Sequence, residues 1–164
     1  MPLSENLIRD YTQILKEELL VAMGCTEPIA IAYAAAIVRK ALGAEPQRIR
    51  VLLSGNIIKN VKSVIVPATG GLHGITAAVS AGIIAAAPEK KLEVLAVLKQ
   101  EDQKRIAEFQ ASCEFTVEEM DTIHPFDLCL EGFSEKEQVL VPSKRITPMW
   151  FLSCAMSRIL QQII

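Results

Sequence analysis

The chain has 164 residues, of which 51% are hydrophobic, 22% charged and 5% aromatic, and its formal net charge is -2. This apolar, nearly neutral composition excludes intrinsic disorder, and a chain of this length can bury roughly two thirds of its unfolded surface without disulfides. The small number of aromatic residues and the lack of a basic arm argue against a nucleic-acid surface, so no nucleic-acid partner is expected.

The first predicted element is an amphipathic helix over residues 5–22, with Ser4 as its N-cap. Its large apolar residues recur at spacings of three and four, which places them on one stripe of a helix. They are Leu7, Ile8, Tyr11, Ile14, Leu15, Leu19 and Leu20. Gly24 ends this helix, and a second helix is predicted over residues 26–42. That second helix is apolar nearly all round, so we expect it to be buried and closely packed.

The middle of the chain predicts one strand followed by further helices. Residues 48–54 alternate and then become fully apolar, which indicates a strand entering a core. After a short amphipathic run, residues 64–66 are strand-like or extended, and residues 67–71 must form a loop because proline and paired glycines suit neither helix nor sheet. Helices are predicted over residues 75–87 and 101–112.

Short strands are expected to follow, at residues 114–120, 126–132 and 138–141. Helices therefore come first and strands last, which predicts an α+β fold: a helix-rich N-terminal part with a small sheet formed by one early strand and several C-terminal short strands. We expect one domain over residues 1–142. The tail from residue 143 to residue 164 has no acidic residue, contains the only tryptophan and lacks a clean period, so it is atypical of the rest.

Location and redox chemistry also follow from the sequence. The longest stretch without a formal charge, residues 63–88, is interrupted by proline and glycines, and the remaining 72–87 is too short for a confident membrane span. No secretory signal is visible, so we expect a cytoplasmic protein without a membrane partner. The four cysteines are widely spaced, which indicates neither a disulfide framework nor a zinc ribbon. They are Cys25, Cys113, Cys129 and Cys154.

The sharpest local motif is Gly-Cys-Thr-Glu-Pro at residues 24–28. Cys25 stands just before a predicted helix N-terminus, where the helix dipole favours a negative charge and would lower the pKa of a thiol. This position suits a nucleophile or a metal ligand, although a small buried residue in a helix-helix turn is the commoner role of such a cysteine. Glu27 is the acidic residue best placed for a chemical role in this motif. An acidic residue in the first turn of a helix can equally serve only to compensate the helix dipole.

Two further motifs carry polar groups. Ser-Gly-Asn-Ile-Ile-Lys-Asn at 54–60 places Asn56 and Asn60 on one helical face with Lys59 beside them, a set able to clamp a carboxylate or simply to form a solvated turn. Pro-Ala-Thr-Gly-Gly at 67–71 leads into a helix and suits an anion-binding nest of backbone amides. It matches neither common nucleotide-binding pattern.

Taken in order, the motifs at 24–28, 54–60, 66–71 and 91–95 resemble the L-cysteine desulfidase family, which is related to the α part of iron-sulfur L-serine dehydratases. The resemblance covers about residues 5–141. It implies an oxygen-sensitive lyase that converts L-cysteine to pyruvate, ammonia and hydrogen sulfide with a four-iron four-sulfur cluster.

Carried over by position, the resemblance makes Cys25 a cluster ligand. It places Thr26, Glu27, Asn56, Lys59, Asn60, Thr69, Gly70 and Gly71 on the substrate side, with L-cysteine or L-serine as the substrate. Ala68 stands where that family usually has glycine, and Val61 where it has a small residue.

Members of that family are more than twice as long, and their remaining cluster cysteines lie in the C-terminal half. The resemblance therefore implies an N-terminal portion that is inactive alone and lacks a bound cluster. Residues 145–151, back-translated with suitable codons, read His-His-Thr-Asn-Val-Val in another frame, which matches the family's next motif. We hypothesise a frameshift just before Ser143.

Three interpretations remain open at this point: a fragment of a desulfidase, a relative of the L-serine dehydratases that deaminates serine, and a non-catalytic module that binds an amino acid or a subunit. Because a missing half would leave apolar helix surface exposed, we also expect a homo-oligomer or association with that half.

Overall fold

The computed structural model describes residues 4–18, 24–135 and 137–142. The end of the first predicted helix, at residues 19–22, the atypical tail and Cys154 lie outside the described residues. The described elements follow the predicted order of helices first and strands last, and they form an α+β fold with a small mixed sheet, which confirms the predicted class.

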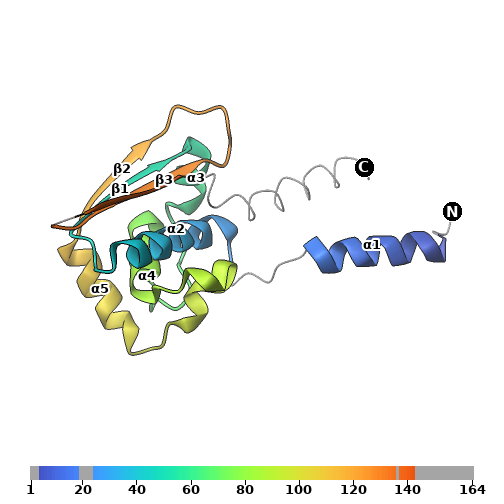
Figure 1. The fold of residues 1–164 in the computed structure, drawn as a ribbon, viewed down its shortest axis with the longest axis horizontal. Helices are drawn as coiled ribbons and strands as arrows, with labels where there is room; N and C mark the ends of the chain where they lie inside the picture. Colours follow the sequence, from blue (N-terminus) through green and yellow to red (C-terminus); the bar gives the residue numbers. More distant parts are fainter. Residues whose placement is uncertain (1–3, 19–23, 136, 143–164) are drawn as a thin grey trace.

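The helix α2, Thr26–Leu42, is the centre of the core. It packs against the helix α4, Gly74–Ala85, and against strands of the sheet (Figure 1). The α2–α4 contact is so close that a Cβ on Gly82 would overlap the carbonyl oxygen of Ala32. The prediction of a buried, closely packed second helix is confirmed, because its alanine-rich face lets two backbones approach.

The sheet has four strands in the order β2-β1-β3-β4. They are β1 (Arg48–Leu53), β2 (Glu114–Glu119), β3 (Leu128–Phe133) and β4 (Gln138–Pro142). β1 pairs in parallel with β2 and antiparallel with β3, and β3 pairs antiparallel with β4. The predicted early strand therefore lies inside the sheet, between two strands that come much later in the chain.

The two faces of the sheet differ in chemistry because side chains alternate along each strand. Ile49, Val51 and Leu53 of β1 are fully buried on the inner face. On the other face, Arg50 forms a bidentate pair with Glu118, at 2.9 Å and 2.7 Å, and approaches Glu131 at 3.5 Å. One arginine thus joins three strands, β2, β1 and β3.

Three short helical segments complete the body. They are α3 (Gly55–Val61), the 3-10 segment η1 (Pro88–Val97) and α5 (Asp102–Ser112). The sequence indicated only an amphipathic run at α3 and nothing helical at η1. Residues 64–66 do not join the sheet; Ile65 makes one isolated bridge with His73, which closes the base of the loop between α3 and α4.

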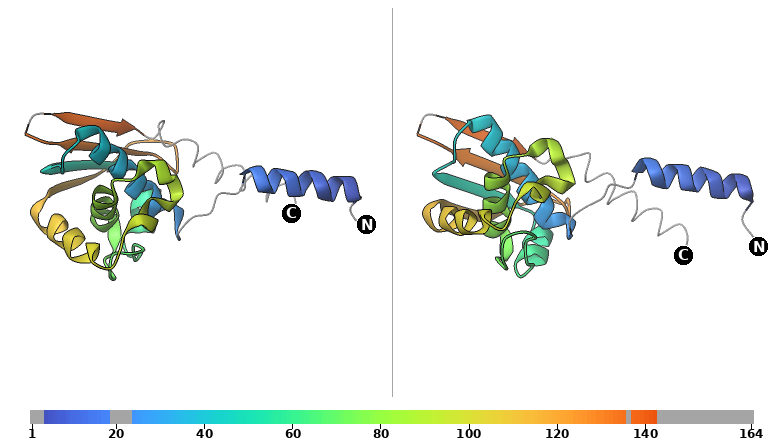
Figure 2. Two further views of the ribbon diagram at one scale, coloured as in Figure 1. Left: turned by 60° about the horizontal axis from the view of Figure 1, so that its bottom comes forward. Right: turned by 90° about the horizontal axis from the view of Figure 1, so that it is seen from below.

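The helix α1, Glu5–Glu18, lies outside this body in every view (Figures 1 and 2). The backbone amide of Leu7 donates to Ser4 Oγ at 3.4 Å, so the predicted N-cap is confirmed. Within the described part of the chain, no helix combines the length and hydropathy needed to cross a bilayer.

Candidate functional site

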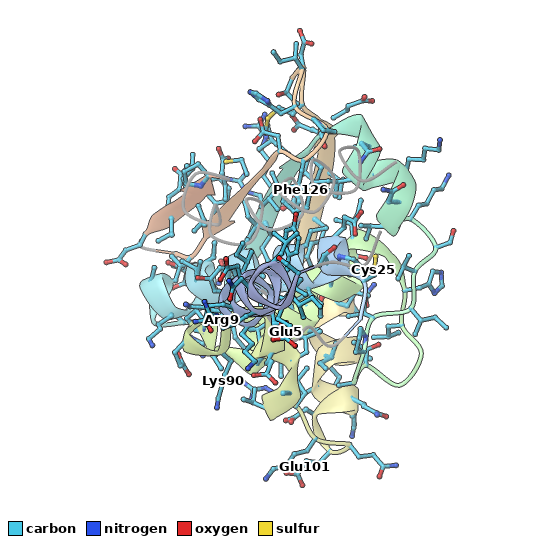
Figure 3. All side chains as sticks on the ribbon, turned by 90° about the vertical axis from the view of Figure 1, so that its right-hand side faces the viewer. Glu5, Arg9, Cys25, Lys90, Glu101 and Phe126 are labelled. Atoms are coloured by element: carbon cyan, nitrogen blue, oxygen red, sulfur yellow. The ribbon has the colours of Figure 1, made fainter. Side chains whose placement is uncertain are left out.

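The start of α2 brings two of the polar motifs into contact. Cys25 is the N-cap residue of α2 and is exposed, and Gly24 before it has a φ of 134°. A Cβ built on Gly24 would lie 3.4 Å from Pro67 Cγ, so the turn before α2 touches the loop at 67–74. Figure 3 views the body from the side on which α1 extends and shows Cys25 within the outline of the body, near the start of α2.

The carboxylate of Glu27 is the centre of this site. Its Oε2 accepts hydrogen bonds from Cys25 Sγ at 3.0 Å and from Thr26 Oγ1 at 3.3 Å. Its Oε1 accepts one from Asn60 Nδ2 at 3.2 Å, which links the first turn of α2 to the last turn of α3. The predicted site residues Cys25, Thr26, Glu27 and Asn60 therefore form one hydrogen-bonded cluster.

The electrostatics of the cluster differ from the sequence-based prediction. The pKa of Cys25 is raised, first by partial burial and then by its hydrogen bond to the Glu27 carboxylate. The predicted lowering of the Cys25 pKa was wrong in direction: the backbone amides of Thr26 and Glu27 do favour the thiolate, but burial and the adjacent carboxylate outweigh them. For Glu27, burial alone would raise the pKa, but the hydrogen bonds from Cys25, Asn60 and Thr26 outweigh it and lower the pKa.

The polar residues of the second motif, 54–60, lie on the helix α3. α3 begins directly after β1, so the end of a buried strand delivers Asn56, Lys59 and Asn60 on a seven-residue helix. All three are exposed, and Asn60 is the one hydrogen-bonded to Glu27. Lys59 precedes Asn60 on the same helix and is exposed.

The third motif forms a tight loop. The Thr69 side chain is 3% exposed, and its hydroxyl lies 2.8 Å from the Val66 carbonyl oxygen and 3.2 Å from that of Leu72. Thr69, predicted to line the substrate side, is therefore engaged in closing the loop. Gly70 and Gly71 are exposed and have φ values of 74° and 102°, which only glycine adopts freely.

One neighbour of this loop was missed from the sequence. A Cβ on Gly70 would lie 2.7 Å from Gln103 Oε1, so the side chain of Gln103 in α5 reaches over the loop. Nothing in the local sequence of α5 marks Gln103, since the contact depends on how α5 packs. Ala68, which stands where the resemblance led us to expect glycine, has a φ of 63°.

The described residues do not fit a four-iron four-sulfur cluster. Such a cluster needs at least three thiolate ligands, and in the described ranges no group of three or more histidine, cysteine, aspartate or glutamate side chains is arranged to hold a metal. Cys113 and Cys129 lie beside and within the sheet, and burial raises the pKa of Cys113 to about 11. Among the described cysteines, Cys25 is thus the one whose thiol belongs to the hydrogen-bonded group of side chains around Glu27.

Comparison with known proteins finds bacterial relatives that share one family name. The chain is 46% identical over 139 residues, 85% of its length, to a protein of Desulfitobacterium hafniense, and 49% identical over 122 residues, 74% of its length, to one of Treponema denticola. The relatives are UPF0597 proteins. A UPF0597 protein of Finegoldia magna is 52% identical over 97 residues. No family model and no solved structure matches the chain.

These relatives correct the resemblance stated above. The similarity runs to UPF0597 proteins, and their names carry no link to L-cysteine desulfidase. The assignment to that family was therefore wrong, and the ordered motifs did not have the specificity it required. The chain spans about a third of the length of the UPF0597 relatives it matches, 32% of the first and 28% of the second.

Proposed function

We propose that the turn at 24–27, the end of α3 and the loop at 67–74 form one side of a binding site for a small amino acid such as L-serine or L-cysteine. The observation that carries this proposal is the cluster around Glu27, in which side chains from two separate motifs meet one carboxylate. Contact between Gly24 and Pro67 brings the third motif to the same place.

The charges of the site suit a zwitterion. A carboxylate has about four acceptor positions and Glu27 uses three of them, so it can accept one further hydrogen bond from a ligand ammonium while it holds its present donors. Lys59 and the exposed backbone around Gly70 and Gly71 supply a cation and amide donors for a ligand carboxylate. The opposite charges on the two sides would orient an amino acid in one direction.

Cys25 has the role of a neutral donor in this proposal. Because its pKa is raised, Cys25 stays protonated at neutral pH, and the thiol donates a hydrogen bond that helps to hold the Glu27 carboxylate in place. This supports a binding role for the described residues over a thiolate nucleophile. The opposite side of the site would be supplied by further sequence of the kind present in the longer UPF0597 relatives.

The proposal is tested by titrating the isotope-labelled 164-residue chain with glycine, L-serine and L-cysteine and following amide shifts by NMR. We expect shifts confined to residues 24–27, 59–60 and 67–71, and their loss in Glu27→Gln. The matched control is Glu93→Gln, which removes an exposed carboxylate of η1 and should leave the titration unchanged. Shifts spread evenly over the body, or equal in both variants, would refute the proposal.

A further inference from the structure

The first turn of α5 places one side chain against the glycine pair of the loop at 67–74. A Cβ built on Gly70 would lie 2.7 Å from Oε1, 3.0 Å from Cδ and 3.6 Å from Cγ of Gln103. The end of the Gln103 side chain therefore lies along the backbone of Gly70, in the space that a side chain at position 70 would occupy. α5 is thus a fourth element beside the candidate site.

The backbone of Gln103 is fixed by hydrogen bonds and by packing. Its N–H donates to the carbonyl oxygen of Gln100 at 3.3 Å. The N–H of Lys99 donates to Asp102 Oδ2 at 2.8 Å, which holds the start of α5. Ile106, nearly one turn further along the same face, is fully buried, and α5 packs against α4 (Figure 2). A side chain presented from an anchored helix is more precisely placed for binding than one on a loop.

The carboxamide of Gln103 has its hydrogen-bonding groups available. Gln103 is half-buried, yet among the residues that the structure describes its side chain has no hydrogen-bond partner. Gln110, two turns further along the same face of α5, differs, because its Nε2 donates to Thr76 Oγ1 of α4 at 2.9 Å. Gln110 thus joins two helices, whereas Gln103 can offer two N–H donors and an acceptor to a ligand.

We propose that Gln103 is a specificity-determining residue of the amino-acid site, and that its carboxamide donates a hydrogen bond to the carboxylate of an amino acid bound at the turn of Gly70 and Gly71. The inference rests on the proposed function, which places the ligand carboxylate at this turn. Glycine at position 70 makes the arrangement possible, since a side chain there would displace the carboxamide. Rotation about the last side-chain torsion, which is soft in glutamine, turns Nε2 toward the ligand.

The experiment compares L-serine with L-serinamide, which keeps the ammonium group and the shape of L-serine but has a neutral carboxamide in place of the carboxylate. Dissociation constants are measured by NMR titration of the 164-residue chain, at a pH at which both ammonium groups are protonated. In Gln103→Leu, the dissociation constant for L-serine should rise about five- to twentyfold, because a hydrogen bond to a charged group is lost. The dissociation constant for L-serinamide should rise less.

A change of charge gives the decisive comparison. In Gln103→Glu, the new carboxylate would repel the carboxylate of L-serine and accept a hydrogen bond from the amide of L-serinamide, so the preference between the two ligands should reverse. The matched control is Gln100→Glu, which adds the same charge at an exposed glutamine just before α5 and should keep the preference for L-serine. Thermal unfolding followed by circular dichroism checks that each variant folds.

The outcomes separate this inference from the proposed function. A wild-type chain that binds neither ligand refutes both. If the wild-type chain binds L-serine and Gln103→Glu keeps the wild-type preference, the role of Gln103 is overturned and the amino-acid site stands. Equal weakening of both ligands in Gln103→Leu and Gln103→Glu also overturns it, because that result would assign Gln103 only to packing of the loop.

Discussion

Asn60 donates a hydrogen bond of 3.2 Å to Glu27, which ties the last turn of α3 to the first turn of α2 across 33 residues of sequence. The same carboxylate holds the Cys25 thiol. With Thr26, three polar side chains donate hydrogen bonds to this one carboxylate.

Replacing Glu27 with Gln should lower the free energy of unfolding by about 0.5–1 kcal/mol at pH 7, a value reduced for partial exposure. The folded-state pKa of Glu27 is lowered, so its carboxylate stabilises the fold above its ordinary pKa, and this contribution is lost as the pH falls through the folded pKa. Urea unfolding at several pH values should show wild type and variant converging in acid. A difference that persists unchanged in acid would contradict this.

Cys25 should react slowly with iodoacetamide at neutral pH because its pKa is raised and thiolate is the reactive form. The rate should rise only at alkaline pH. In Glu27→Gln the profile should move to lower pH, since the neighbouring negative charge is removed. Peptide mass spectrometry separates Cys25 from Cys113, whose profile, with a pKa of about 11, serves as the internal control. Identical Cys25 profiles in wild type and Glu27→Gln would show that the Glu27 charge does not contribute to the raised pKa.

Gly82→Ala should destabilise the fold by about 1–3 kcal/mol or more, because the new methyl group meets the Ala32 backbone, which cannot move without separating α4 from α2. Gly132→Ala is the informative comparison. Its methyl group meets Cγ1 of Val38, which is stiff and buried, but this clash can be relieved by a side-chain shift without separating two helix backbones, so its cost should be smaller. Chemical unfolding of both variants compares the two losses in free energy of unfolding. Equal losses would argue against the view that the Ala32 backbone makes Gly82→Ala the more costly change.

Two alanines have left-handed backbone conformations, and replacing either with glycine is predicted to stabilise the fold. Ala68 has a φ of 63° and Ala86, the C-cap of α4, has a φ of 49°. Either residue changed to glycine should stabilise the fold by roughly 0.5–1 kcal/mol, because glycine adopts this conformation without steric cost. Ala85→Gly, one position earlier and inside the helix, should have the opposite sign. Thermal unfolding distinguishes them, and a loss of stability in both Ala68→Gly and Ala86→Gly would refute the argument.

The parts of the fold that could be predicted are those with a strong hydrophobic pattern in the sequence. The all-round apolar run of α2 predicted a buried helix, and the alternation after Arg48 predicted β1. The 3-10 segment η1 was missed because Pro88 reads as a stop, whereas Pro is also suited to the first turn of a new helix. The pairing of β1 with β2 depends on contacts distant in sequence, which no local pattern encodes.

The candidate site also has a part that could be predicted from the sequence and a part that could not. The motifs identified Cys25, Thr26, Glu27 and Asn60, which the structure joins in one cluster. The direction of the Cys25 pKa shift could not be predicted from its place before a helix, because it depends first on how far the thiol is buried and then on the rotamer of the Glu27 side chain, and the sequence specifies neither. For the same reason the hydroxyl of Thr69, turned into its own loop, was indistinguishable from a ligand contact.

The position of β1 has a consequence for synthesis of the chain. β1 is made early, yet both of its neighbours, β2 and β3, follow it by a long stretch of sequence, with Arg48 opposite Glu114 on one side and Phe133 on the other. While the nascent chain grows, both edges of β1 present unpaired backbone groups until those strands have emerged from the ribosome. The helices α3 to α5 are produced during this interval, so completion of the sheet is a late event in folding.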